Sequence, residues 1–424
     1  MIKRIAYILL VLSQISAFSC YGLGDRKDTG GKIVKCTLKN GIEVALYCDF
    51  KMEEVVVCIV FHVGRIDAPI DKGAITDVIC DNIVNTKLHR QFQDLGIRYE
   101  ICSSDFSTRI VAHMHPENLD KFFSVLSKSL DGIVVENLEM YKKQWISEYK
   151  LRSYCCDDTV DNHIRANVKF SDESTLPVFS EQSIDSITES DVKLFYKNNF
   201  INCPLTIIVS GAVGHKSLRK MLRDSFSDLP PRKARTYREP QKIEYRDILI
   251  ENQYMGTSIR YGYVLSAEEN SKFGETFDHM LSHEMQKFFC GVYPLCDFCI
   301  STPAGNGGCL KLITLYPKYD ISLKTLANSY GAFVRKMSTM EITPDSIKKI
   351  AERESMDNSF VFANLGTMYN VILDAFINGM DVNHIYSIAN DIIAVNTKEF
   401  RAFVEKMFRQ NPIFRITTKF KRDS

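Results

Sequence analysis

The sequence has almost no net charge and little hydrophobic sequence of membrane-spanning length. Its 53 basic and 52 acidic residues give a formal charge of +1, so no excess of either sign would draw it to nucleic acid or to an anionic membrane surface. Beyond the N-terminal segment, no apolar run reaches the length of about 20 residues that spans a bilayer. We therefore expect no nucleic-acid partner, and a mature chain that is tethered, if at all, only at its start.

Cysteine is present, but the patterns that would give it a role are missing. The 13 cysteines have irregular spacings in a long chain, which argues against a disulfide scaffold. Cys296-x-x-Cys299, with Cys290 and Cys309 nearby, imitates a zinc or redox site, but no second C-x-x-C accompanies it. We interpret these cysteines as small apolar strand residues and assign no bridge.

The N-terminus has the order of a secretory signal. The basic start Met1 to Arg4 is followed by the apolar run Ile5 to Ile15 and by small residues up to Cys20. We predict a signal peptide at residues 1–19 and an exported protein, in the periplasm or cell envelope of a bacterium. Cleavage there would leave Cys20 first, so three fates stay open: a lipid anchor at Cys20, plain cleavage, or an uncleaved anchor.

The remaining chain repeats one order of elements. In the first half, strands around Val44 to Phe50 and Val55 to Val63 precede a helix. In the second half, strands around Asp247 to Asn252 and Thr257 to Leu265 precede another helix, from about Phe273. Repetition on this scale points to duplication. The predicted divisions are an N-terminal domain at 32–229, a Pro- and Arg-rich linker at 230–245 and a homologous C-terminal domain at 246–420.

The helix from Gly73 to Thr86 organises the first half, because its apolar positions form one buried stripe. It follows the first two strands and a Gly64-Arg65 turn. This arrangement resembles the opening of the insulinase/pitrilysin family of zinc peptidases, the inverzincins, whose next helix carries H-x-x-E-H. The resemblance extends from about Lys32 to Lys419. It implies an α+β fold of two homologous units, each a mostly antiparallel sheet covered by helices.

The zinc motif itself is degenerate. Aligned without a gap, the first His falls on Thr76, the Glu on Ile79 and the second His on Cys80. The chemistry needs two imidazoles one helical turn apart to hold zinc, and a carboxylate to take a proton from the metal-bound water. A hydroxyl, an aliphatic side chain and one thiol supply neither. We predict that this chain binds no cofactor and is not active alone.

A second helix, from about Glu136 to Tyr154, resembles the one that bears the family's third zinc ligand. The resemblance places Glu148 at that ligand position and Tyr141 where the family has a supporting glutamate. One carboxylate without imidazoles gives no reason to expect tight zinc binding. We therefore interpret Glu148 as a vestigial position, occupied by a solvated or hydrogen-bonded helix residue.

The second half contains a histidine pair that has to be compared with the missing motif. His279 and His283 lie four residues apart with Glu284 beside them. The order H-x-x-x-H-E places the carboxylate outside the pair, in the half where the family has no metal, so we interpret the pair as incidental.

The substrate-holding residues of the family also lack counterparts in the second half. The resemblance places their Arg on Lys287 and their Tyr near Asp297 or Phe298. The segment Pro303 to Gly308 is interpreted as a hairpin turn.

Three functions are compatible with these observations. The first is a non-catalytic subunit that pairs with an exported sister bearing zinc and an intact H-x-x-E-H, and shapes a chamber for a peptide or unfolded polypeptide. The second is a structural core-type subunit without proteolysis. The third is an active metallopeptidase with an unusual metal site. A neighbouring gene for an H-x-x-E-H sister would favour the first over the second, and bound zinc would favour the third, because fold alone does not fix function.

Overall fold

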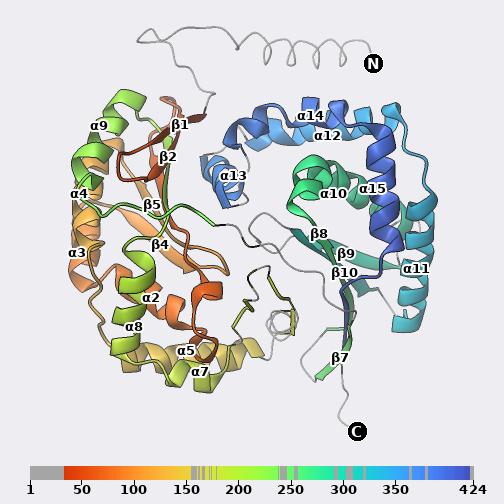
Figure 1. The fold of residues 1–424 in the computed structure, drawn as a ribbon, viewed down its shortest axis with the longest axis horizontal. Helices are drawn as coiled ribbons and strands as arrows, with labels where there is room; N and C mark the ends of the chain where they lie inside the picture. The colour runs from red at the N-terminus through yellow and green to blue at the C-terminus, as the bar shows by residue number, and fades with distance from the viewer. Residues whose placement is uncertain are drawn as a thin grey trace.

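A computed structural model of the 424-residue chain provides the structure (Figure 1). The described residues are 33–153, 160, 163–164, 168–170, 172, 174–177, 179–236, 238, 246–252, 256–290, 295–301, 309–318, 321–361, 365–377 and 381–420. The predicted signal peptide, Cys20 and the predicted hairpin at 303–308 lie outside them. Among the described helices, none has the length and apolar character that crossing a membrane requires.

The first half is built on a six-stranded sheet with the strand order β1-β2-β6-β3-β5-β4. Neighbouring strands pair antiparallel except β2 and β6, which run parallel. β3 is buried along its whole length, as its unbroken apolar sequence requires. The strands are β1 (Ile33–Thr37), β2 (Glu43–Cys48), β3 (Val55–Phe61), β4 (Arg98–Ser103), β5 (Thr108–Met114) and β6 (Leu205–Gly211).

Helices cover one face of this sheet. Alternate strand residues such as Val57, Ile59 and Ile207 pack with apolar helix residues in one buried cluster, because successive strand side chains point to opposite faces. The helices are α2 (Ile75–Ile83), α3 (Thr86–Asp94), α4 (Leu119–Ser129), α5 (Leu138–Ser153), α7 (Glu181–Asp185), α8 (Glu189–Phe195) and α9 (His215–Phe226). Shorter turns are η1 (Arg65–Asp67), η2 (Ile70–Lys72), η3 (Pro116–Asn118) and the π-helical η4 (Tyr196–Phe200).

The second half repeats this strand order. Its sheet runs β7-β11-β8-β10-β9, with β7 parallel to β11 as β2 is to β6 and all other pairs antiparallel. Only a counterpart of β1 is missing among the described residues, so the topology supports a duplication. The elements are β7 (Arg246–Asn252), β8 (Ser258–Leu265), α10 (Ala267–Phe289), β9 (Cys296–Ser301), β10 (Cys309–Pro317), α11 (Leu323–Thr339), α12 (Pro344–Val361), α13 (Leu365–Ile377), η5 (Val382–Tyr386), α14 (Ile388–Ala394), α15 (Thr397–Arg409) and β11 (Phe414–Phe420).

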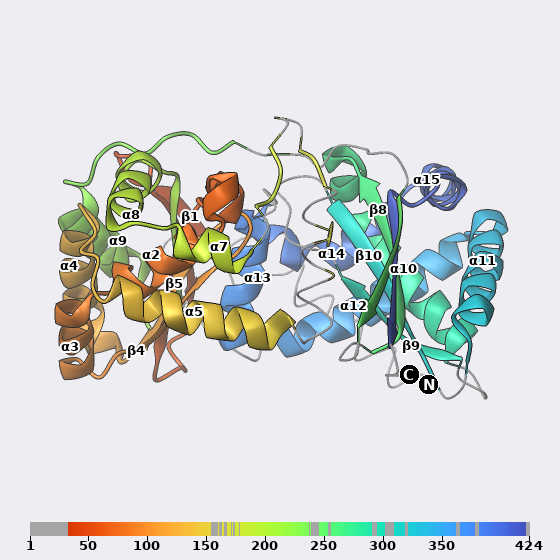
Figure 2. The ribbon, with the colours of Figure 1, turned by 90° about the horizontal axis from the view of Figure 1, so that it is seen from below.

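Each half also covers the second face of the other half's sheet. Helix α13 lies between the two sheets (Figures 1 and 2) and packs on β3 and β6. Its Met368 and Ile372 share a buried cluster with Cys58 and Ile208 of the first sheet. The first half in turn covers one face of the second sheet, because a second buried cluster joins residues of both. Its members include Val160, Val168, Phe170, Leu312, Phe414 and Ile416.

The predicted α+β architecture of two helix-covered sheets is confirmed, and the differences are local. The helix predicted from Gly73 to Thr86 is shorter, since α2 ends at Ile83. A separate helix, α3, follows it, and the Asn85 side chain caps its start by accepting a hydrogen bond from the Leu88 N–H. Helix α10 begins earlier than predicted, at a capping box formed by Ser266 and Glu269. The boundary at residues 230–245 stays a prediction, which limited proteolysis can test.

Candidate functional site

Helix α2 holds the three degenerate motif positions, and all three are turned into the protein interior. Thr76 and Ile79 are 0% exposed and Cys80 is 8% exposed. Ile79 belongs to the hydrophobic cluster beneath the helices, together with Val78 and Ile83. The helix therefore uses these positions for packing.

The Cys80 thiol is held in its protonated form. Burial raises its pKa well above the ordinary value, the charges of Asp77, Cys102 and Asp81 add to the increase, and Arg65 opposes it. Because the thiolate is the form that binds metals and attacks electrophiles, a thiol with a raised pKa is a poor ligand and a poor nucleophile.

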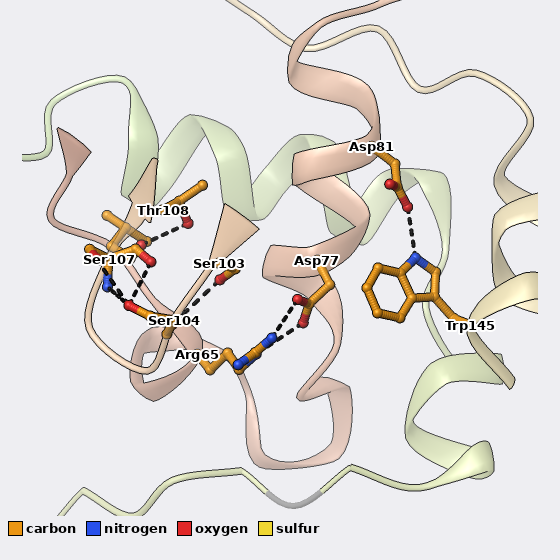
Figure 3. Close-up of polar contacts among 9 residues, drawn as sticks. Arg65, Asp77, Asp81, Ser103, Ser104, Ser107, Thr108 and Trp145 are labelled. Atoms are coloured by element: carbon orange, nitrogen blue, oxygen red, sulfur yellow. Dashed lines mark hydrogen bonds and ion pairs between the residues drawn. The ribbon is translucent and has the colours of Figure 1, made fainter. Parts of the chain in front are cut away.

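The polar side chains of α2 make contacts that fix the helix in place (Figure 3). Arg65 forms two hydrogen bonds with Asp77: Nη2 to Oδ1 at 2.7 Å and Nε to Oδ2 at 3.1 Å. Their side chains are 18% and 4% exposed, and the Arg65 guanidinium also lies 5.1 Å from the centre of the Phe179 ring. This bidentate, largely buried pair ties α2 to the turn that precedes it.

One helical turn later, Asp81 connects α2 to α5. Trp145 donates from Nε1 to Asp81 Oδ2 at 2.7 Å, as Figure 3 shows. Burial raises the pKa of Asp81; the Trp145 hydrogen bond opposes this, and the charges of Asp77 and Glu148 add to it. Glu148 itself accepts a hydrogen bond from Gln144 Nε2 at 2.9 Å. The interpretation of Glu148 as a vestigial ligand position stays a prediction.

These residues do not fit a zinc ion. The Thr76 hydroxyl is buried without a hydrogen-bond partner in the described structure, Ile79 offers no donor atom, and the Cys80 thiol has a raised pKa. Within the described part of the chain, no group of three His, Cys, Asp or Glu side chains comes close enough to hold a metal. The three motif positions of α2 therefore do not form a set of zinc ligands.

The turn before α2 is locked against the end of β4. The backbone N–H groups of Arg65 and Ile66 donate to the carbonyl oxygens of Ser104 and Asp105 at 3.0 and 2.9 Å. A Cβ atom at Gly64 would lie 2.5 Å from the Asp105 backbone, so this close approach requires glycine. β4 is the outermost strand of its sheet and packs beside α2.

Sequence reasoning identified the helix but missed its polar contacts. Asp77 and Asp81 lie four residues apart, which places two carboxylates on one helix face, and this signal was available beside the degenerate motif. Arg65 and Trp145 stood in the segments that carried the resemblance, but nothing in the sequence indicates which carboxylate each would contact.

His279 and Glu284 of the second half have separate structural contacts. His279 Nε2 pairs with Glu354 of α12. Glu284 pairs with Lys336 at 2.7 Å and with Lys287 at 3.3 Å. The carboxylate beside the two histidines is thus already neutralised by lysines, and His279 acts as a link between α10 and α12.

The remaining predicted positions of the second half lie on or beside β9. Cys296 is buried and Cys299 exposed on this strand, because residues three apart point to opposite faces, so the C-x-x-C pair cannot close on one ligand. Asp297 pairs with Lys318 at 2.6 Å, and Phe298 packs against the second-half core.

A histidine contact in the same half should make stability depend on pH. His384 of η5 binds Glu275 of α10 through Nε2 at 3.0 Å and Asp391 of α14 through Nδ1 at 3.0 Å. The hydrogen bond to Glu275 raises the pKa of His384 above its ordinary 6.5, burial opposes the increase, and Asp391 adds to it. The protonated imidazole is therefore favoured in the folded state. The contribution of this contact to the stability of the folded protein is fully present below pH 6.5, the ordinary pKa of histidine. It is lost as the pH rises through the raised pKa of His384.

We expect the His384→Gln variant to be clearly less stable than the wild type at about pH 6 and nearly equal to it at about pH 9. Urea unfolding at both pH values measures the difference. Lys349→Gln is the control, because the pair of Lys349 and Asp345 lies exposed on α12. A His384→Gln difference that stays constant between the two pH values would contradict the linkage.

Comparison with known proteins agrees with this architecture. No family model and no curated protein matches the sequence. Among solved structures, a protease from Helicobacter pylori superposes with a TM-score of 0.76 at 15% identity, over 92% of this chain and 99% of that one. The periplasmic protease PqqL from Escherichia coli gives 0.72 at 13% identity, over 93% of this chain and 48% of that one. Pitrilysin gives 0.69 at 12%, over 95% and 46%. The chain has the pitrilysin fold.

The pitrilysin fold is the one that the sequence pattern predicted. This chain corresponds to nearly all of the H. pylori protease but to about half the length of PqqL and of pitrilysin. At these sequence identities the structural similarity establishes the fold. Activity has to be judged from the side chains of the site. On the pitrilysin-fold framework of this chain, the α2 side chains serve packing and ion pairing.

Proposed function

We propose that this protein is the non-catalytic subunit of an exported heterodimeric zinc peptidase and forms a wall of the chamber that encloses a peptide or unfolded polypeptide. The observation that carries the proposal is the state of α2. The helix is well packed and doubly anchored, by Arg65 to Asp77 and by Trp145 to Asp81, while its motif positions are unsuited to zinc. A protein that keeps this packed helix but lacks zinc ligands on it is suited to form a chamber wall beside a catalytic subunit.

The edge of the first sheet supports substrate binding on this wall. β4 ends the strand order and pairs with β5 alone among the described strands. An extended peptide can add to such an edge through main-chain hydrogen bonds without any catalytic residue nearby. Because β4 lies beside α2, a bound peptide would run past the position where active relatives carry out the reaction.

The structural neighbours support an exported role. PqqL is described as periplasmic, which agrees with the predicted signal segment. We therefore place the proposed sister, which carries the intact H-x-x-E-H and the zinc, in the same compartment.

Co-expression with an exported H-x-x-E-H sister tests the proposal. We expect a stable one-to-one complex, with zinc in the sister and a peptidase activity above that of the sister alone. The isolated chain should hydrolyse no peptide and should lose any zinc to a mild chelator. A sister that is equally active by itself and does not associate would rule out the heterodimer. Stoichiometric zinc held by the isolated chain would instead indicate an unusual metal site.

A further inference from the structure

The segment that joins the two halves is fixed to several parts of the fold by its arginines. Arg232 donates from Nη1 to the carbonyl oxygen of Ile201 at 2.6 Å, just after η4. Arg235 donates to the carbonyl oxygen of Phe376, in the last turn of α13. Carbonyl groups at a helix C-terminus carry partial negative charge, so a cation there is favourable. The segment is thus bound to both halves at once.

A third arginine of the segment connects it to the turn before α2. Arg238 contacts Asp67 Oδ1 at 2.8 Å and Asp172 Oδ2 at 2.7 Å, with its side chain 25% exposed. The other oxygen of Asp67 accepts the Gly64 N–H at 2.9 Å. The Asp67 carboxylate therefore holds the joining segment and the turn together.

From this turn the contacts continue into α2. Arg65 lies in the same short turn η1 as Asp67, and its guanidinium makes the bidentate pair with Asp77. The turn has little freedom, since Gly64 already lies against the Asp105 backbone. Asp67 and Arg65 therefore belong to one tightly held turn, which contacts α2 through Arg65.

We propose that Arg232, Arg235 and Arg238 form an arginine strap that couples the position of α13 on the first sheet to the position of α2. α13 belongs to the second half and rests on β3 and β6 of the first. When the second half shifts, α13 carries the Phe376 carbonyl with it, and Arg235 passes the shift three residues along the chain to Arg238. The coupling combines the Arg235 hydrogen bond to α13, the chain between the two arginines and the ion pair of Arg238 with Asp67. It requires no partner subunit, so it stands or falls separately from the proposed heterodimer.

Hydrogen exchange on the isolated full-length chain tests the strap. In the Arg238→Ala variant, we expect the amides of α2 to exchange on the order of tenfold faster, because two charge-assisted contacts are lost. In Arg235→Ala, the same acceleration should appear in α2 together with one in α13. Helix α11 should be unchanged in both. Arg223→Ala is the matched control, since Arg223 lies exposed on α9 beside Asp224.

The Arg235→Ala variant, which is substituted at the α13 end of the strap, decides between coupling and no coupling. If α2 keeps its wild-type exchange in Arg235→Ala, or if α11 accelerates as much as α2, the strap does not couple the two helices. Arg238→Lys keeps the charge but can no longer form the same forked contact, so we expect an intermediate acceleration in α2. This variant also serves if Arg238→Ala does not fold, and a wild-type exchange rate in it would contradict the proposal.

Discussion

Replacing Ile79 with glutamate, the residue that an H-x-x-E-H motif would place there, is expected to lower the free energy of unfolding by about 4 kcal/mol or more. Ile79 is 0% exposed and packs among apolar residues. A carboxylate there would be buried without a partner, and its protonation would only lessen the cost. Urea unfolding at neutral pH measures the loss.

Two further variants show whether burial is the reason. Ile79→Leu keeps the volume and should cost less than about 1.5 kcal/mol. The triple variant Thr76→His, Ile79→Glu and Cys80→His restores the motif, and we expect it to be less stable than the wild type whether or not zinc is added. If zinc returned the triple variant to wild-type stability, α2 would still contain a usable metal site and our interpretation of its packing would be wrong.

The second large effect is expected at the ion pair between Arg65 and Asp77. Asp77→Asn should cost about 3 kcal/mol, because it leaves a largely buried guanidinium without its counter-charge. The side chains are 18% and 4% exposed, so added salt should screen the pair only weakly. Unfolding measured at low and high ionic strength checks both the size of the loss and its insensitivity to salt.

The matched control is the surface pair of Arg98 and Glu54, whose side chains are 74% and 53% exposed. Glu54→Gln should change stability by less than about 1 kcal/mol, and the change should disappear in high salt. Equal losses from Asp77→Asn and Glu54→Gln would mean that the pair at α2 has no special structural role.

The general fold was predictable because its signals are local and periodic. The unbroken apolar run that became β3 and the strands β7 and β8 were located within one or two residues of their observed ends. The separate helix α3 was missed, since its start depends on one side-chain hydrogen bond, from the Leu88 N–H to Asn85, and such a local contact leaves no periodic signal. The start of α10 was missed for a similar reason.

At the site, the degenerate positions were correctly located on a helix, but their surroundings depend on tertiary contacts. The sequence does not specify that Trp145 reaches Asp81 or that Arg238 reaches Asp67, because these partners lie 64 residues apart and on different elements. Long-range ion pairs leave no periodic signal in the sequence. The strap could therefore be recognised only from the structure, although its arginines were visible in the predicted linker.

Each half covers one face of the other half's sheet, and this arrangement has a consequence for how the molecule unfolds. A fragment ending at residue 229 would lose α13 and expose the strip of Cys58, Val60 and Ile208, which lies in the shared cluster, and such an apolar strip promotes aggregation. The second half alone would likewise lose the cover that Val160 and Phe170 give to its sheet. We therefore expect the two units to unfold together in one transition, and neither unit to be recoverable as an independent domain.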